Sequence, residues 1–168
     1  MTHRWRGFRH RPEPEPVPVP VAAARPGTGV HTLTMAVAPT MVRLATRTTH
    51  TVLTARGVPA GAAVLDAALL IVTELATNTV RHTRSARATL AVLVSEDHFT
   101  IAVRDDDPRV PEVPAPDDAP PATGHGRGLA VVAGLAADFG GHLTAIPERS
   151  GPGKTISVLL PLSTAPRP

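Results

Sequence analysis

The chain has no cysteine and no long uninterrupted apolar run. The absence of cysteine excludes disulfide bonds and thiolate metal sites, and it agrees with a reducing compartment. A membrane-spanning helix needs about 18 consecutive apolar residues, and no run reaches that length. The first residues are basic without an apolar stretch behind them, unlike a secretory signal. We therefore expect a cytoplasmic protein without a membrane partner.

Positive charge is concentrated at the N-terminal end. The formal net charge is +3, but residues 1–11 contain four Arg and no acid. The remainder holds fourteen acids and the other thirteen basic residues, a balance that predicts no specific nucleic-acid partner. Over residues 12–20 every second residue is proline, a pattern typical of an extended, unfolded segment. We expect a disordered basic and proline-rich arm at 1–29, one domain at 30–162 and a short tail at 163–168.

Hydrophobic periodicity predicts eight secondary-structure elements in the expected domain. Residues at helical spacing predict three helices, and apolar runs between turn residues predict five strands. The helices are expected at about 39–56, 60–83 and 129–137, and the strands at about 30–37, 88–95, 98–103, 142–146 and 155–160. This order predicts an α/β fold, a two-layer sandwich in which about three helices cover one face of a mixed, largely antiparallel sheet.

A line of polar residues interrupts the second predicted helix. Residues 74–82 read E-L-A-T-N-T-V-R-H, and the spacing of Glu74, Asn78 and His82 places them on one helical face. The rest of this helix is so apolar that it should be mostly buried, where polar groups need partners. Asn78 offers a neutral oxygen of the kind that Mg²⁺ accepts, and Glu74 could take a proton from a nucleophile near a metal-bound phosphate. The plain alternative is a helix end that turns polar as it reaches solvent.

Three later motifs add to this pattern. Residues 103–108 read V-R-D-D-D-P and place Asp105 where a strand ends and a loop begins. Residues 124–129 read G-H-G-R-G-L and enter an apolar helix, where glycines let backbone N–H groups approach a phosphate. Residues 153–155 read G-K-T and open the last strand. The glycine motif alone is more often a flexible loop than a nucleotide site, but chance rarely produces the whole order.

Together these motifs resemble the gyrase and histidine-kinase type ATPase superfamily, and specifically its small anti-sigma-factor serine kinases. The resemblance covers roughly residues 30–162 and implies ATP and Mg²⁺ as cofactors. It implies that Glu74 is the catalytic general base and that Asn78 is the Mg²⁺ ligand. It implies that Asp105 accepts a hydrogen bond from the adenine amino group. It also implies that Thr155, in the last strand, shares a water with this Asp. The implied nucleotide-contact residues are Asn78, His82, Asp105, Gly124, Gly126, Arg127, Gly128 and Thr155.

One motif departs from the family pattern. The first glycine box usually reads Asp-x-Gly-x-Gly, whereas Asp107 and Arg109 hold the glycine positions here, with Pro108 between them. A second carboxylate beside a polyanionic ligand should weaken ATP binding unless Arg109, Arg104 or a metal compensates for its charge. The following segment, 109–123, contains five prolines and three acids and is the expected ATP lid. Its alternative is a disordered surface insertion.

Two classes of function agree with the resemblance. The first is an ATP- and Mg²⁺-dependent protein serine/threonine kinase of the anti-sigma-factor type, acting in partner-switching regulation, and Glu74 favours it. The second is an ATP-binding regulatory module that sequesters a partner with little or no kinase turnover, and Asp107 and Arg109 favour it. A pseudo-ATPase that has lost nucleotide is a weaker hypothesis, because most motif residues remain.

The partners follow from the resemblance and not from the residues. A sigma factor or an anti-sigma-factor antagonist protein is the implied partner, and a homodimer through the first helix and strand is also expected. A histidine kinase needs a phosphoacceptor His on a separate helix, and residues 1–29 show no such element. His82 and His125 lie inside nucleotide-contact motifs, so we do not expect either to accept phosphate.

Overall fold

The computed structural model describes residues 29–115 and 127–162, which form five strands and three helices. All eight elements predicted from the sequence are present, and their ends differ from the prediction by at most three residues. The predicted arm up to residue 28, the predicted tail and residues 116–123 of the predicted lid lie outside the described residues. In chain order the elements are β1 (Gly29–Ala36), α1 (Thr40–Ala55), α2 (Ala63–His82), β2 (Arg87–Val94), β3 (His98–Asp105), α3 (Arg127–Asp138), β4 (His142–Pro147) and β5 (Lys154–Pro161).

The five strands form one sheet in the order β1-β2-β3-β5-β4. Every hydrogen-bonded pair of strands among the described residues is antiparallel. The prediction of an α/β fold is confirmed. The sheet was expected to be mixed and largely antiparallel, and it is antiparallel throughout. Although β3 and β4 run in the same direction, β5 lies between them and pairs with both, so no parallel pair forms. The position of β5 also brings the end of β3 beside the start of β5, where Asp105 and Lys154 are partners in the register.

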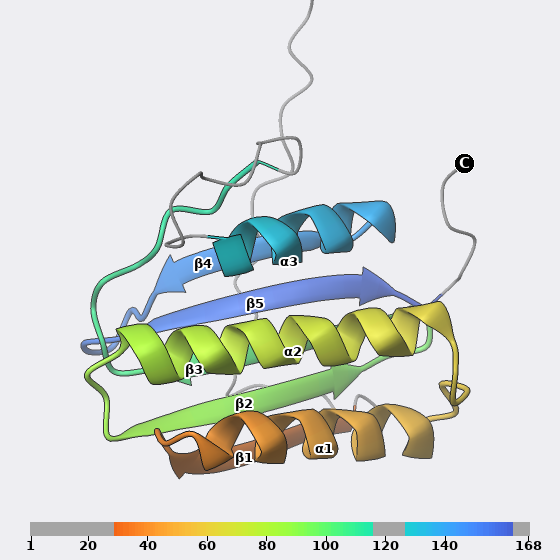
Figure 1. The fold of residues 1–168 in the computed structure, drawn as a ribbon, viewed down its shortest axis with the longest axis horizontal. Coiled ribbons are helices and arrows are strands. Elements are labelled where there is room, and N and C mark those ends of the chain that lie inside the picture. The colour runs from red at the N-terminus through yellow and green to blue at the C-terminus, as the bar shows by residue number, and fades with distance from the viewer. Residues whose placement is uncertain (1–28, 116–126, 163–168) are drawn as a thin grey trace, which may run out of the picture.

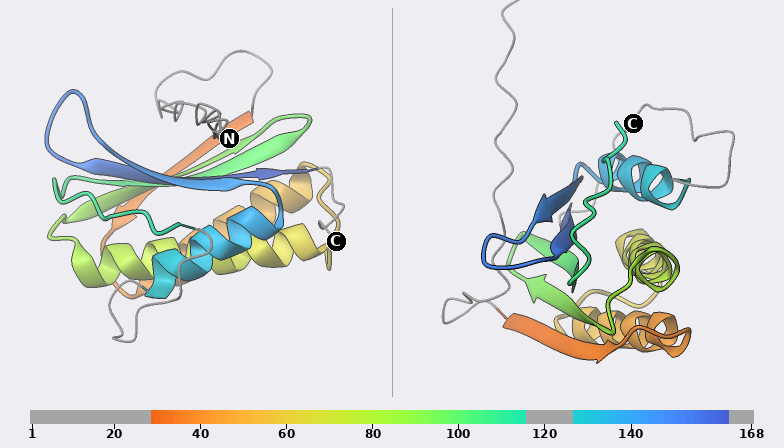
Figure 2. Two further views of the ribbon diagram at one scale, coloured as in Figure 1. Left: turned by 90° about the horizontal axis from the view of Figure 1, so that it is seen from above. Right: turned by 90° about the vertical axis from the view of Figure 1, so that its left-hand side faces the viewer.

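The three helices cover one face of the sheet, with α2 between α1 and α3 (Figures 1 and 2). The core lies between the two layers and includes fully buried Phe99, Ile101, Leu90 and Ile71. Each such side chain contributes about 1.5–3 kcal/mol when it is removed from water. The expectation of a two-layer sandwich with three helices on one face is therefore confirmed.

Two helices end in the same hydrogen-bonded cap. At the end of α1, Gly57 N–H donates to the Thr54 carbonyl and Val58 N–H donates to the Leu53 carbonyl, each at 3.0 Å. Gly57 has a φ of +89°, which a residue without a side chain adopts without strain. Gly140, with a φ of +73°, repeats this arrangement after α3. These caps stop the helices where the chain must turn back to the sheet.

By length and composition, α2 could cross a membrane. In the fold it is the central core helix, because Ile71, Val72 and Leu75 are at most 1% exposed and half of its apolar window is buried. Core helices commonly have this composition. Its apolar character is explained by packing within the domain, and its C-terminal half carries the polar residues of the site.

Candidate functional site

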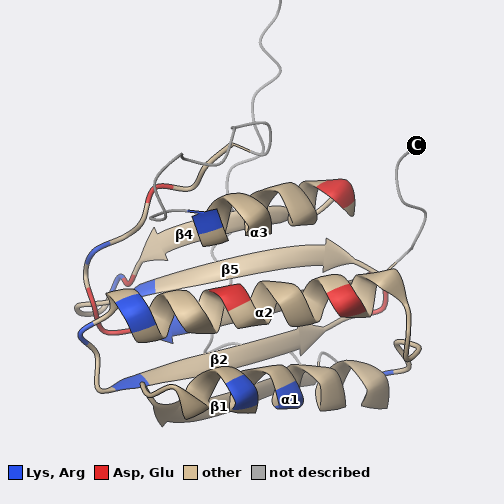
Figure 3. Ribbon diagram, in the orientation of Figure 1, with Lys and Arg blue, Asp and Glu red and all other residues tan. Residues whose placement is uncertain are grey.

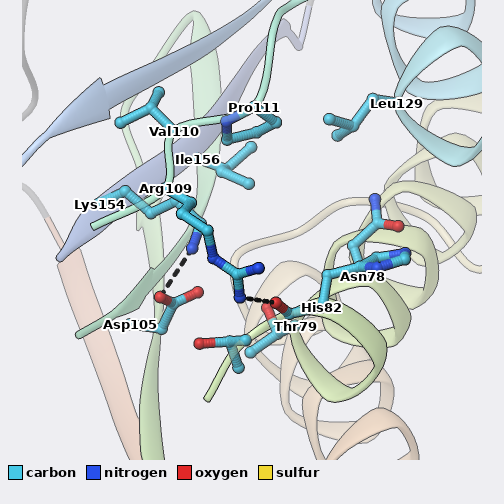
Figure 4. A pocket seen from close by; sticks show the side chains of 11 residues that line it. Asn78, Thr79, His82, Asp105, Arg109, Val110, Pro111, Leu129, Lys154 and Ile156 are labelled. Atoms are coloured by element: carbon cyan, nitrogen blue, oxygen red, sulfur yellow. Dashed lines mark hydrogen bonds and ion pairs between the residues drawn. The ribbon is translucent and has the colours of Figure 1, made fainter. Parts of the chain in front are cut away.

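A pocket of about 320 Å³ lies where four elements meet. It is enclosed by the C-terminal end of α2, the ends of β3 and β5 that lie side by side, the loop after β3 and the start of α3 (Figure 4). Apolar side chains supply part of its wall, and polar groups come from α2, β3 and β5. The lining residues are Asn78, Thr79, His82, Thr83, Asp105, Arg109, Val110, Pro111, Leu129, Lys154 and Ile156.

One side of the pocket carries a buried ion pair between neighbouring strands. Lys154 Nζ lies 2.9 Å from Asp105 Oδ1, and the two side chains are only 9% and 3% exposed. Buried charges must be paired, and the register of β3 and β5 brings these two residues together. Lys154 also donates to the Asp107 carbonyl at 3.2 Å. Asp105 was predicted at the end of a strand. It is the last residue of β3, and it lines the pocket.

Asp107 is paired as well, although it sits where the family has glycine. Arg109 donates to both of its carboxylate oxygens, from Nε at 2.9 Å and from Nη2 at 2.6 Å. The backbone N–H of Arg84 donates to the same carboxylate at 3.1 Å. Hydrogen bonds from the Arg109 side chain, its backbone N–H and the Arg84 N–H hold the Asp107 pKa well below its ordinary range.

These bonds compensate for the negative charge of the Asp107 carboxylate, which would otherwise repel a polyanionic ligand. The compensating group is Arg109. Arg104 instead contacts Asp106 at 3.3 Å and Glu148 at 3.6 Å. Figure 3 shows acidic and basic segments interspersed at the end of the sheet where β3 ends and β5 begins. The altered motif therefore adds a matched ion pair to the site, and not an uncompensated negative charge.

The loop after β3 is fixed by two successive aspartate turns. Asp107 N–H donates to Asp105 Oδ1 at 2.8 Å, and Arg109 N–H donates to Asp107 Oδ1 at 3.1 Å. Such side chain to backbone bonds replace a backbone turn. No non-glycine residue in the described chain has a positive φ. Asp107 and Arg109 thus occupy the family's glycine positions with an ordinary backbone conformation.

Arg109 joins this loop to α2. Its Nη2 atom donates to the His82 carbonyl at 2.7 Å (Figure 4). Val110 and Pro111 follow it and line the pocket, so the described beginning of the predicted lid lies at the site. His82, expected at the nucleotide, also lines the pocket. The bond from Arg109 ties the first residue of the predicted lid to the end of the helix that carries Asn78.

The start of α3 packs closely on the polar face of α2. A Cβ atom built on Gly128 would lie 2.7 Å from Glu74 Oε2 and 3.4 Å from both amide atoms of Asn78. A side chain at this position would make the Glu74 carboxylate shift, since real Cβ atoms essentially never come within 3.0 Å of another heavy atom. The fold therefore brings together Glu74, Asn78 and Gly128, as the motifs predicted. Arg127 is the first residue of α3, while Gly124 and Gly126 lie outside the described residues.

One residue expected at the site points away from it. The Thr155 hydroxyl donates to Glu148 Oε1 at 2.6 Å, and Thr155 does not line the pocket. Successive side chains of a strand point to opposite faces. In β5 the pocket-lining residues are Lys154 and Ile156, which places Thr155 on the other face. The structure therefore does not place Thr155 in the pocket, and Lys154 occupies the position beside Asp105.

Lys154 is a pocket-lining residue that the motifs did not indicate, and strand alternation could have found it. Ile156, Val158 and Leu160 are buried in the core. Counting back from them in steps of two reaches Lys154, not Thr155. The G-K-T motif indicates the threonine as the site residue, but the alternation of side chains along the strand determines that the lysine faces the pocket.

The site residues fit one Mg²⁺ that enters together with phosphate groups. Within residues 29–115 and 127–162, no cluster of three or more His, Asp or Glu side chains could hold a metal. Asn78 Nδ2 is buried without a hydrogen-bond partner, so this amide is a polar group that lacks its partner in the described residues. The assignment of its O and N atoms is interchangeable. Mg²⁺ commonly takes one or two protein ligands and completes its shell with phosphate and water.

Comparisons with known proteins agree with this geometry. Residues 35–158 match the family model of the histidine kinase-like ATPase domain, and since they are most of the chain, the protein belongs to this family. Membership implies that the domain binds ATP. No curated protein matches the chain.

Among solved structures, the chain is similar to the histidine kinase domain of the blue-light activated histidine kinase from Erythrobacter litoralis EL346. The identity is 24% and the TM-score is 0.42. The match covers 59% of this chain and 46% of that one, so the chain spans less than half of that protein's length.

Proposed function

We propose that this protein is an ATP- and Mg²⁺-dependent protein serine/threonine kinase of the anti-sigma-factor type that acts in partner-switching regulation. The observation that carries the proposal is the contact of Gly128 with Glu74 and Asn78. It supports the idea that a carboxylate able to act as a base lies beside an amide able to hold a metal, at the helix start that the motifs associate with phosphate binding. The family membership supports ATP as the phosphoryl donor.

Each residue has a defined part in this proposal. Glu74 takes the proton from the acceptor hydroxyl as its oxygen bonds to the γ-phosphorus, and the bond to the β-phosphate oxygen breaks to leave ADP. Asn78 holds Mg²⁺, which supplies charge neutralisation to the phosphates when bound. The N-terminal turn of α3 offers backbone N–H groups to the phosphates, and Arg127 adds positive charge.

A second function is favoured by the bond between Arg109 and the His82 carbonyl. A loop tied to α2 could change position when nucleotide enters the pocket, and thereby change the affinity for a protein partner without turnover. We propose as this alternative an ATP-binding regulatory module that sequesters its partner. In both cases we propose a sigma factor or an anti-sigma-factor antagonist as partner, a cytoplasmic location and a homodimer, with support from the family resemblance alone.

Incorporation of labelled γ-phosphate into a candidate antagonist protein tests the kinase proposal. Wild type is expected to transfer phosphate in the presence of Mg²⁺. Glu74→Gln is expected to bind ATP normally but to transfer phosphate more slowly by about 10²- to 10⁴-fold. The glutamine keeps the shape of the side chain but cannot act as a general base. The matched control is Asp66→Asn, which removes the acid in the first turn of the same helix and should leave transfer unchanged. Wild type that changes partner affinity with ATP but never transfers phosphate would support the module instead.

A further inference from the structure

The ammonium group of Lys154 has a hydrogen-bond donor that none of the described residues uses. A lysine ammonium has three N–H donors. Two of them are taken, by Asp105 Oδ1 at 2.9 Å and by the Asp107 carbonyl at 3.2 Å. Among residues 29–115 and 127–162 no acceptor takes the third, although the side chain is only 9% exposed and lines the pocket. A nearly buried donor of this kind is costly unless a ligand satisfies it.

Asp105 beside it has an unused acceptor. Its Oδ1 atom accepts from Lys154 and from the backbone N–H of Asp107 at 2.8 Å. Its Oδ2 atom makes no hydrogen bond to the described residues. Figure 4 shows the two side chains next to one another at one edge of the pocket, with Asn78 across from them. The pocket therefore presents a donor and an acceptor side by side, from neighbouring positions of β3 and β5.

We propose that Lys154 is a base-recognition residue, which donates to a ring nitrogen of adenine while Asp105 accepts from the exocyclic amine. This inference rests on the proposed binding of ATP. In adenine the amine is flanked by two acceptors, N1 and N7, so either edge offers the adjacent donor and acceptor that this pair requires. The structure thus gives the base two direct partners, of which the sequence motifs indicated only Asp105.

Another role for Lys154 is purely structural. It could do no more than neutralise Asp105 and hold the loop through the Asp107 carbonyl. Either role predicts that a lysine substitution lowers ATP affinity, so a substitution alone does not separate them. GTP does not separate them either, because guanine also presents an adjacent acceptor and donor, its O6 and N1–H. The separation requires ligands that lack one ring nitrogen.

The test compares ATP with 1-deaza-ATP and 7-deaza-ATP, in which N1 or N7 is replaced by C–H. Calorimetry with Mg²⁺ is carried out on wild type and on Lys154→Met. Wild type is expected to bind one analogue about 10- to 100-fold more weakly than ATP, as for loss of a hydrogen bond to a charged donor, and the other with nearly the affinity of ATP. Lys154→Met is expected to bind ATP and the weak analogue equally.

Three results would overturn this inference. Wild type could bind both analogues as tightly as ATP, Lys154→Met could keep the wild-type discrimination, or the variant could weaken all three ligands by one common factor. The wild-type comparison needs no substitution, so it decides even if Lys154→Met fails to fold. The double variant Asp105→Asn, Lys154→Met removes both buried charges together and should likewise lack the discrimination. A wild type that binds no ATP at all would instead contradict the proposed nucleotide function.

Discussion

Two acid and base pairs, Asp105 with Lys154 and Asp107 with Arg109, define one end of the pocket. Each pair has one negative and one positive charge, so this end repels a polyanionic ligand less than its three consecutive aspartates would suggest. The two pairs differ in how far apart their partners lie in the sequence. Arg109 is two residues from Asp107, whereas Lys154 is brought to Asp105 by strand pairing. The first pair was available to sequence reasoning as a local contact, and the second required the order of the strands.

The hydrogen bonds of Asp107 predict a pH-dependent loss of stability. Its pKa is lowered on folding, chiefly by Arg109, so the ionised carboxylate favours the folded state. This contribution is complete above the ordinary pKa of 3.8 and is lost as the pH falls from there toward the lowered value. Urea unfolding of wild type and Asp107→Asn should therefore differ at pH 6, and the difference should shrink on acidification to about pH 2. Asp106→Asn, at the exposed neighbouring acid, is the control, and a pH-independent difference would contradict the assignment.

Gly128 is a glycine at which a small addition should affect the site. A methyl group there would collide with Glu74 Oε2 and press on the Asn78 amide. The Glu74 carboxylate must turn aside to make room, and the start of α3 then sits differently against Asn78, so Gly128→Ala should weaken Mg-ATP binding by up to about tenfold. Calorimetry measures this. Gly151→Ala is the matched control, because a Cβ at Gly151 meets nothing within 4 Å. Equal ATP affinity of the two variants would show that the contact of Gly128 with α2 does not matter for nucleotide.

At the scale of the elements, periodicity predicted more than motif comparison did. The three helices were found from apolar spacing because each buries one face, and the strands from short apolar runs because most of them are buried almost throughout. The motif comparison placed Asp105 at the pocket correctly, but it placed Thr155 there against the alternation of β5. The sheet was expected to be largely antiparallel and is antiparallel throughout, but the insertion of β5 between β3 and β4 was not predicted, because it depends on non-local pairing that local pattern does not record.

The outward orientation of Thr155 on β5 predicts a variant that loses stability and keeps function. Thr155→Val removes the hydrogen bond to Glu148 and should lower the free energy of unfolding by about 1 kcal/mol. Nucleotide affinity should not change, since the side chain lies on the face away from the pocket. Urea unfolding and calorimetry with ATP measure the two quantities. Ser157→Ala, also on β5, removes a hydrogen bond to Thr144 of β4 and serves as the comparison. A clear loss of ATP affinity in Thr155→Val alone would return Thr155 to the site.

At the scale of the whole molecule, the site exists only where separate elements meet. Its residues come from α2, the end of β3, the start of α3 and the start of β5, and none of these segments supplies both the proposed metal ligand and a proposed base contact. The core holds these elements in place, since α2 packs against both neighbouring helices and the sheet. Nucleotide that bridges the same elements should therefore stabilise the fold as a unit, by an amount set by its concentration and affinity.

This linkage predicts how Mg²⁺ should act on the whole domain. Mg²⁺ alone should not raise the free energy of unfolding, because the described residues contain no cluster of His, Asp or Glu ligands. Mg-ATP at about 100 times its dissociation constant should raise it by about 2.7 kcal/mol. In Asn78→Ala the stabilisation by ATP should no longer depend on Mg²⁺, since the buried amide that lacks a partner is the proposed ligand. Thr77→Ala, one position earlier on α2 and outside the pocket lining, should behave as wild type. Thermal and urea unfolding with and without Mg²⁺ measure these differences, and stabilisation of Asn78→Ala that still requires Mg²⁺ would remove Asn78 from the metal site.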